Sequence, residues 1–322
     1  MIPHDLNPRK VKLPETGEHS IVLITGDSLR HRRFAYHLQK EFGDQVLAWF
    51  QFKSGTTLKH YHRREKLLRL FKKAKYQLLQ NYKFKDIYYY IRVKGLFKSI
   101  TKALFLIYSL AQSVYISLRL RRSLIFYEQK LFQQEIEELK SDTSLLPQAI
   151  KDPNSQEFIE QIKKLNPYFF LSAGGPLYKK ELLASIRGVA INLHAGWSPV
   201  LKGSYTIEWA LYHRNLHYVG STVHLTTTGA DAGPILRRSQ PCLLSADTPE
   251  TCFLRSVAVG TELVIEVVRE IMADKGIMVY DQPPSFGLTY LRSQLTKDVL
   301  KAIYGDFSNN WLQNELSRTR NF

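Results

Sequence analysis

The stretch Ser20-Ile21-Val22-Leu23-Ile24-Thr25-Gly26-Asp27-Ser28 joins an unbroken apolar run to a turn that ends in a helix-capping side chain. The apolar run lacks polar alternation and predicts a buried strand. Residues 29–42 carry an apolar stripe at helical spacing, and residues 45–52 predict a second strand. Strand, turn, helix and strand in this order begin a parallel α/β sheet. The turn lacks the glycine spacing of a dinucleotide site and the Gly-Lys-Ser ending of a phosphate loop, which argues against a nucleotide site there.

The α/β pattern resumes at residue 154. The expected elements are a helix 154–165, a strand 168–172, a turn 173–176, a helix 178–185, a strand 188–193, a helix 204–213, a strand pair 218–226 and 235–243, and a long helix 248–272. We therefore expect an α/β fold with a Rossmann-like, mostly parallel sheet and helices on both faces. In such sheets, ligands bind beyond the carboxyl ends of the parallel strands.

A basic segment interrupts this pattern. Residues 53–122 contain 18 Lys and Arg against only Glu65 and Asp86, so this segment accounts for the whole net charge of +16. Clustered cations of this kind bind polyanions, here a phosphate-bearing ligand, RNA or an acidic membrane surface. Its centre, 103–118, is uncharged for 16 residues, fewer than the roughly 20 that span a bilayer. The pattern favours a helix packed on protein, with peripheral membrane contact as the alternative.

These patterns divide the chain into four parts. We expect the start of the α/β domain in 1–52, a basic helical insertion in 53–140, the catalytic part of the α/β domain in 141–274 and a C-terminal extension in 275–322. Apolar residues make up 44% of the chain, enough for a buried core. The two cysteines and the histidines show no metal-ligand spacing, and the first 20 residues are polar, so a cytoplasmic protein without a metal is expected. The oligomeric state is left open.

Three polar residues indicate an enzyme. Asn192 and His194 stand at the end of an expected strand, and Asp231 lies between two glycines further along the chain. An amide, an imidazole and a carboxylate form a plausible acid/base set. Taken singly, a buried structural histidine and an aspartate in a turn are the simpler interpretations. Their spacing within a strand, helix and strand favours catalysis.

With these motifs in place, residues 191–234 resemble the catalytic core of the folate-dependent formyltransferases, which include the glycinamide ribonucleotide, methionyl-tRNA and amino-sugar enzymes. The family pattern is Asn-x-His, a loop with Pro and Gly, a helix, a strand and an Asp-x-Gly-Pro turn. Here it reads Asn192-Leu193-His194, Pro199 and Gly203, 207–211, 221–224, and Asp231-Ala232-Gly233-Pro234. The likeness extends less sharply to 21–52 and 168–272.

The resemblance implies that 10-formyltetrahydrofolate is the cosubstrate and that Asn192, His194 and Asp231 are catalytic. Asn192 and a protonated His194 would donate to the oxyanion that forms on the formyl group, and Asp231 would keep His194 charged and help to move the proton. By position, the residues expected to bind the folate are Gly174, Gly175, Pro176, Leu177, Tyr178, Thr227, Thr228, Gly229 and Ala230.

Two departures from the family pattern concern the ligand sites. Family members often carry bulkier residues at Gly174-Gly175, and Leu-Leu-Pro in place of Trp197-Ser198-Pro199. Trp197 and Tyr205 flank the motif and are suited either to stacking on an acceptor ring or to packing under a loop. The cations at 30–33 open the first helix, where an acceptor phosphate would meet them, although cations oppose the helix dipole there.

The leading hypothesis is an enzyme that formylates a primary amine, preferably an amino sugar on a nucleotide or lipid carrier. Methionyl-tRNA and glycinamide ribonucleotide are alternative acceptors; the 48 residues 275–322 are too few for the RNA-binding barrel that methionyl-tRNA enzymes usually append. A second alternative is a hydrolase in which water attacks the formyl-folate. A third is a polyanion- or membrane-binding protein on an inactive formyltransferase scaffold.

Overall fold

The computed structural model describes residues 6–11, 13, 19–52, 96–141, 143, 145–273, 277–283 and 286–319, and their side chains except at 96–117, 293 and 319. The chain forms two compact units, one of Met1–Gly55 with Ser123–Phe322 and the other of Thr56–Arg122. Residues 53–95, which carry most of the cations of the expected basic segment, lie outside the described residues. The first unit holds the sheet and is called the α/β unit below.

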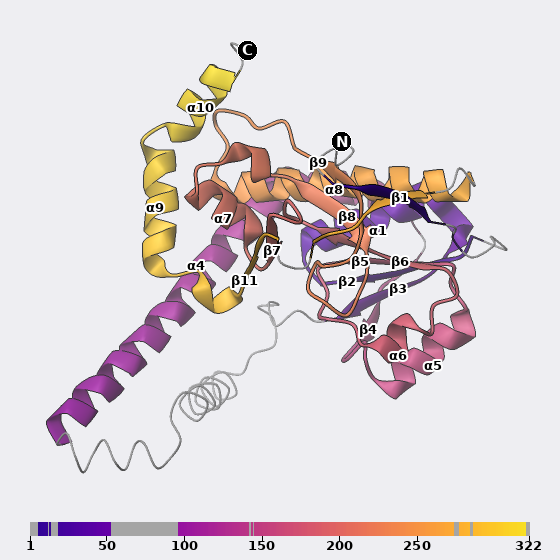
Figure 1. Ribbon diagram of the computed structural model, residues 1–322, viewed down its shortest axis with the longest axis horizontal. Helices are drawn as coiled ribbons and strands as arrows, with labels where there is room; N and C mark the ends of the chain where they lie inside the picture. Colours follow the sequence, from indigo (N-terminus) through magenta and orange to yellow (C-terminus); the bar gives the residue numbers. More distant parts are fainter. Residues whose placement is uncertain are drawn as a thin grey trace. The chain divides into compact units, whose positions relative to one another are not determined.

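Nine strands of the described chain form the main sheet of the α/β unit, in the order β1-β10-β9-β8-β6-β5-β2-β3-β4 (Figure 1). They are β1 Pro8–Val11, β2 Ile21–Thr25, β3 Val46–Phe52, β4 Gln148–Ile150, β5 Phe169–Ala173, β6 Val189–His194, β8 Ser221–Leu225, β9 Ile235–Ser239 and β10 Ile277–Tyr280. Strands β4-β3-β2-β5-β6 pair in parallel, and the other four continue the sheet antiparallel. The expected Rossmann-like α/β class is confirmed.

Helices cover both faces of this sheet (Figure 1). The helices of the described chain are α1 Leu29–Phe42, α4 Leu96–Ser141, α5 Gln156–Leu165, α6 Lys180–Leu183, α7 Thr206–Tyr212, α8 Pro249–Met272, α9 Lys297–Ser308 and α10 Trp311–Thr319, with the short 3-10 helices η1 Gly43–Gln45, η3 Leu216–Tyr218 and η4 Arg292–Gln294. The helix expected at 29–42 is α1, and the helix expected to end at Met272 is α8.

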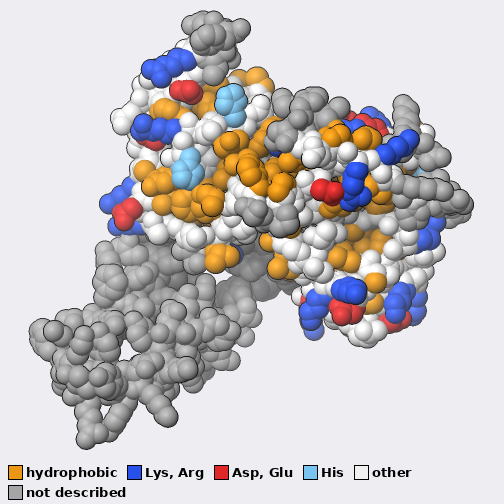
Figure 2. Space-filling model, in the orientation of Figure 1, with side chains coloured by type: hydrophobic (Ala, Val, Ile, Leu, Met, Phe, Trp, Pro, Cys, Tyr) orange, Lys and Arg blue, Asp and Glu red, His pale blue; other side chains and the backbone are white. Residues whose placement is uncertain are grey.

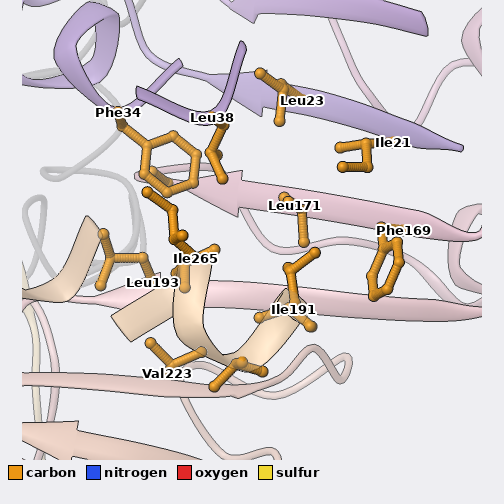
Figure 3. Packing of buried hydrophobic residues seen from close by; sticks show 14 of the residues in the cluster. Ile21, Leu23, Phe34, Leu38, Phe169, Leu171, Ile191, Leu193, Val223 and Ile265 are labelled. Carbon is orange, nitrogen blue, oxygen red and sulfur yellow. The ribbon is translucent and has the colours of Figure 1, made fainter. Parts of the chain in front are cut away.

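Strand β2 explains why helices are needed on both faces. All five of its residues are buried, and successive side chains of a strand point to opposite faces. Ile21 and Leu23 pack in a core with residues of α1 and α8, as Figure 3 shows. Val22 and Ile24 pack in a second core with residues of α5 and α6. The unbroken apolar run of the sequence therefore marks a strand that is covered twice.

Helix α4 contributes its C-terminal part to the first core. Phe132, Ile136 and Leu139 are buried there and lie on one face of the helix, since their spacing is four and three residues. Residues 123–140, which the sequence assigned to the insertion, thus belong to the α/β unit. The side chains of 103–117 lie outside the described residues. Among the helices that the structure describes, none has a stretch long and apolar enough to cross a bilayer.

The C-terminal segment is also part of the α/β unit. Strand β10 pairs with β1 and β9, and a second, two-stranded sheet joins β11 Leu288–Tyr290 to β7 Leu201–Gly203. Helix α9 packs against α7 and α8. The residues expected to form an extension therefore complete the sheet and reach β7, which lies one loop beyond His194.

Candidate functional site

Asn192 is held in a fixed orientation by the strands on either side of it. In the sheet register it lies beside Ser172 of β5 and His224 of β8. The Ser172 hydroxyl donates to Asn192 Oδ1 at 2.8 Å, and Asn192 Nδ2 lies 3.1 Å from His224 Nε2. The amide oxygen is thereby occupied, and one N–H of Asn192 is left to point elsewhere.

His224 fixes this arrangement. Its Nδ1 lies 2.9 Å from the Leu225 carbonyl, which only accepts, so Nδ1 donates there, and Nε2 is the ring atom that faces Asn192 Nδ2. The same Nε2 lies 3.5 Å from Asp231 Oδ1. His224 is buried. Sequence analysis did not include it in the site, because a histidine within a strand reads as a core residue; only its position opposite Asn192 in the sheet register reveals the contact.

His194 and Asp231 form the central pair. His194 Nδ1 lies 3.3 Å from Asp231 Oδ2, and Nε2 lies 3.3 Å from the Leu201 carbonyl. Burial lowers the pKa of His194, while the Asp231 carboxylate and the Leu201 carbonyl act against that shift. Burial alone would raise the pKa of Asp231, but His194, His224 and the Gly203 N–H reverse this and hold it well below its usual range. The pair thus combines an ionised carboxylate with an imidazole able to exchange a proton.

Asp231 is held by its backbone as well as by its side chain. Its φ of +48° lies in the left-handed region, which aspartate tolerates better than most residues. Gly203 N donates to Asp231 Oδ2 at 3.0 Å. Gln282 Nε2 donates to the carbonyls of Asp231 and Gly233 at 2.8 and 2.6 Å. Gly203 stands in the sequence motif, but its contact with Asp231 and that of Gln282 do not follow from a local pattern and could not be predicted.

The first loop expected to bind folate, 174–178, follows β5. A Cβ at Gly174 would lie 2.5 Å from His31 Nε2, and a Cβ at Gly175 would lie 2.3 Å from the Tyr178 hydroxyl. The two glycines therefore make room for these rings, which accounts for the absence of the family's bulkier residues. Pro176 and Leu177 are exposed, with Leu177 at 58%.

The second expected loop, 227–230, follows β8 on the other side of β6 and leads directly to Asp231. Thr228 and Gly229 are exposed, and Thr227 and Ala230 are partly buried. Thr226 Oγ1, at the start of this loop, is buried without a hydrogen-bond partner among the described residues. A buried hydroxyl in that state takes its partner from a bound water or from a polar ligand. The two loops thus follow the two neighbours of the strand that carries Asn192 and His194, and because β8 is antiparallel to β6 the second loop starts beside Ala190 before it reaches Asp231.

The cations at the start of α1 have protein partners. Arg30 pairs with the buried Glu128, and Arg33 Nε lies 2.6 Å from Glu135 Oε2, both carboxylates belonging to α4. Burial lowers the pKa of His31 well below its ordinary value, and Ser28 Oγ lies 2.8 Å from its Nδ1. An acceptor phosphate is thus not expected at Arg30 and Arg33. The carboxylates of α4 offset the unfavourable position of these cations in the helix dipole.

The aromatic residues near the motif separate into two roles. Trp197 is buried, with the Arg238 guanidinium 4.6 Å from its ring centre, so it packs under the loop. Tyr205 is partly buried, and Arg292 Nε donates to its hydroxyl at 3.3 Å. Phe286, Leu288 and Leu291 are more than half exposed. Figure 2 shows apolar side chains gathered on this face around α7 and β11.

The buried carboxyl of Glu208, on α7, makes the stability of the protein depend on pH. Burial raises the pKa of the Glu208 carboxyl to about 7, and the Glu250 carboxylate adds to the rise. Because this pKa lies above the unfolded value of 4.5, its contribution to stability is present below about pH 4.5 and is lost as the pH rises through about 7. We expect Glu208→Gln to raise the free energy of unfolding by about 2–3 kcal/mol near pH 8 and to change it little near pH 4.5.

Urea unfolding of both proteins at the two pH values measures this difference. Glu137→Gln, at an exposed position of α4, is the matched control and is expected to leave the free energy of unfolding unchanged at both. An equal effect of Glu208→Gln at both pH values would contradict the prediction.

Comparison with known proteins gives a match to one family model over part of this chain. Residues 129–268 match the model of the formyl transferase family. The chain is 35% identical to a methionyl-tRNA formyltransferase of Thermodesulfovibrio yellowstonii over 153 residues, and this matched region covers 47% of each chain. It is 27% identical over 132 residues to that of Caldanaerobacter subterraneus, covering 41% of this chain and 42% of the relative. The chain thus spans about half the length of the curated relatives it matches.

Similar solved structures include two further enzymes of this kind. A sugar N-formyltransferase from a Shewanella species is 15% identical, with a TM-score of 0.47 and coverage of 88% of each chain. Glycinamide ribonucleotide transformylase 1 of Symbiobacterium toebii is 14% identical, with a TM-score of 0.46 and coverage of 81% of this chain and 91% of that chain. Among the described residues of the present chain, no group of three His, Cys, Asp or Glu is arranged to hold a metal ion.

Proposed function

We propose that the protein transfers a formyl group from 10-formyltetrahydrofolate to a primary amine, because residues 129–268 match the model of the formyl transferase family. The observation that carries the proposal is the contact of His194 with Asp231 near Asn192, whose amide oxygen accepts from Ser172 and whose N–H remains available. This arrangement supplies the oxyanion donors and the proton acceptor that acyl transfer to an amine requires.

The proposed division of labour follows from the contacts of each side chain. The free N–H of Asn192 donates to the formyl oxygen as it becomes negative, and a protonated His194 joins it when its Nε2–H exchanges the Leu201 carbonyl for that oxygen. The bond from the formyl carbon to the acceptor nitrogen forms, and its bond to the folate nitrogen breaks. The acceptor nitrogen loses a proton and the folate nitrogen gains one. Asp231, which is ionised and contacts His194, stabilises the positive charge and assists this transfer.

The two loops beside β6 are proposed to hold the folate. Residues 174–178 offer an exposed turn with the apolar Leu177 side chain, and residues 227–230 follow the buried Thr226 hydroxyl. A pterin ring needs both an apolar surface and polar partners. The folate supplies the activated formyl group; the loops bind and orient it.

An amino sugar on a nucleotide or lipid carrier is the proposed acceptor. Tyr205 lies two residues after Gly203, whose N–H contacts Asp231, and Arg292 lies against the Tyr205 ring. An aromatic ring beside a guanidinium suits a sugar ring that carries a phosphate. The basic segment 53–122 would add attraction for phosphate-bearing acceptors, with RNA or an anionic membrane surface as its alternative ligands.

Methionyl-tRNA is the second candidate acceptor, because both relatives named above are methionyl-tRNA formyltransferases. The two candidates are separated by incubating the full chain with 10-formyltetrahydrofolate and, in turn, amino-sugar nucleotides, methionyl-tRNA and glycinamide ribonucleotide. We expect tetrahydrofolate release to depend on an amino sugar and the product to gain the mass of one formyl group.

Other outcomes of the same assay select the alternatives. Formylation of methionyl-tRNA alone would replace the proposed acceptor. Release of formate at full rate without any amine would indicate a hydrolase. The absence of both turnover and folate binding would contradict formyl transfer. It would leave an inactive scaffold that binds polyanions or membranes through the basic segment.

A further inference from the structure

A segment beyond the matched family domain reaches the site from the C-terminal side. Residues 277–283 and 286–290, called the brace here, begin in β10 and end in β11. Tyr280 pairs with Ile235 of β9, which directly follows the loop that carries Asp231. The brace lies after residue 268, where the match to the formyl transferase family ends.

The first contact of the brace is with the Asp231 backbone. The amide nitrogen of Gln282 donates to two carbonyls of the same loop, those of Asp231 and Gly233, at 2.8 and 2.6 Å. A Cβ at Gly233 would lie 1.7 Å from the Leu225 carbonyl oxygen, so the loop is also closely packed from behind. One side chain therefore uses both of its amide protons to hold the turn in which Asp231 adopts a left-handed conformation.

The second contact is with β7, which holds the Asp231 side chain. Strand β11 pairs with β7 so that Tyr290 lies beside Gly203, and Ser204 N donates to the Tyr290 carbonyl at 2.9 Å. The Tyr290 ring stacks on Trp209 at 4.2 Å. Gly203 in turn donates its N–H to the Asp231 carboxylate. The brace thus fixes Asp231 from both ends, through its carbonyl and through its carboxylate.

We propose that the brace completes the reaction site and that Gln282 is a positioning residue, which holds Asp231 at the distance from His194 that the transfer requires. The catalytic part of this inference rests on the proposed function. The positioning part does not, because it concerns only the contact between Asp231 and His194. Asp231, His194 and the brace all lie in the α/β unit.

The test compares the full chain with Gln282→Met, which keeps the approximate length of the side chain and removes both donors. We expect kcat for formyl transfer to fall about tenfold, as for the loss of a pair of hydrogen bonds, and KM for the folate to stay within about twofold. Burial lowers the pKa of His194, and of the two titratable groups that face it Asp231 raises this pKa and His224 lowers it. If the Asp231 carboxylate moves away from His194 in the variant, the midpoint of the His194 NMR titration should therefore move to lower pH.

Gln133→Met, the same substitution at an exposed position of α4 outside the brace, is the matched control and should change neither quantity. If Gln282→Met does not fold, Gln282→Asn, which is one methylene shorter, takes its place. A folded variant with unchanged kcat and an unchanged His194 titration would overturn the proposal. If the unaltered chain formylates no amine, the proposed function fails, and the NMR titration alone decides whether Gln282 positions Asp231.

Discussion

Replacement of His194 by alanine, or of Asp231 by asparagine, is expected to remove measurable formyl transfer while the fold stays intact. The His194 ring is a proposed oxyanion donor, and removal of one such donor typically lowers turnover by about 10²–10³. Asp231→Asn keeps the size of the side chain but removes the charge that supports a protonated His194. Steady-state rates with saturating 10-formyltetrahydrofolate and the best acceptor measure both effects.

His217→Ala is the control for this pair, since His217 is exposed and its side chain lies outside the set of contacts around Asp231. Its rate should equal that of the unaltered chain. Circular dichroism establishes that each variant is folded. A near-normal rate in folded His194→Ala or Asp231→Asn would remove these residues from the proposed chemistry.

Gly203→Ala is expected to have the second large effect, on both stability and rate. Gly203 has a φ of +90°, and a Cβ there would lie 2.4 Å from the Tyr290 carbonyl oxygen. The overlapping atom belongs to the backbone of a paired strand and cannot rotate away. We expect the free energy of unfolding to fall by at least about 2 kcal/mol. Displacement of the Gly203 N–H from Asp231 should also lower kcat.

Gly305→Ala provides the matched control in the interior of α9. No described atom lies within 4 Å of a Cβ at Gly305, so the substitution meets open space. Alanine favours the helix by about 0.8–1 kcal/mol over glycine. Urea unfolding should therefore show opposite signs for the two glycine variants. A stabilising or neutral Gly203→Ala would contradict the contacts described for β7 and β11.

The sequence predicted those parts of the fold whose pattern is local. Helix α1 has the bounds that its apolar stripe indicates, and β2 lies within the buried strand expected at 20–25. Helix α8 begins after Thr248, which accepts from Thr251 N as its capping pattern suggests. Long or fully buried elements leave a clear signal because each of their residues repeats it.

Short strands that depend on distant partners were not predicted. Strand β1 consists of mostly exposed residues and exists through its pairing with β10. Strands β7 and β11 have three residues each and pair with one another. Three residues are too few to display a period, and a pairing partner almost ninety positions away leaves no local trace. The packing of the C-terminal part of α4 in the core was not predicted either, because no break in the sequence separates its apolar face from the basic stretch before it.

The site divides in the same way. Asn192, His194 and Asp231 stand in a spaced motif that proposes them as a set, and the structure brings His194 and Asp231 into contact. His224 orients Asn192 only because the register of β6 and β8 places them side by side. Gln282 acts on the Asp231 loop from 51 positions away. Residues that orient others carry no motif, because their role depends on the fold and not on their neighbours in sequence.

The most direct test of the account is the rate at which the full chain converts 10-formyltetrahydrofolate to tetrahydrofolate with and without an amine, measured beside Asp231→Asn. We predict amine-dependent release by the unaltered chain, with the formyl group recovered on the amine, and none by Asp231→Asn. Equal release by both proteins, or release that does not depend on any amine, would contradict the assignment of Asn192, His194 and Asp231 to formyl transfer.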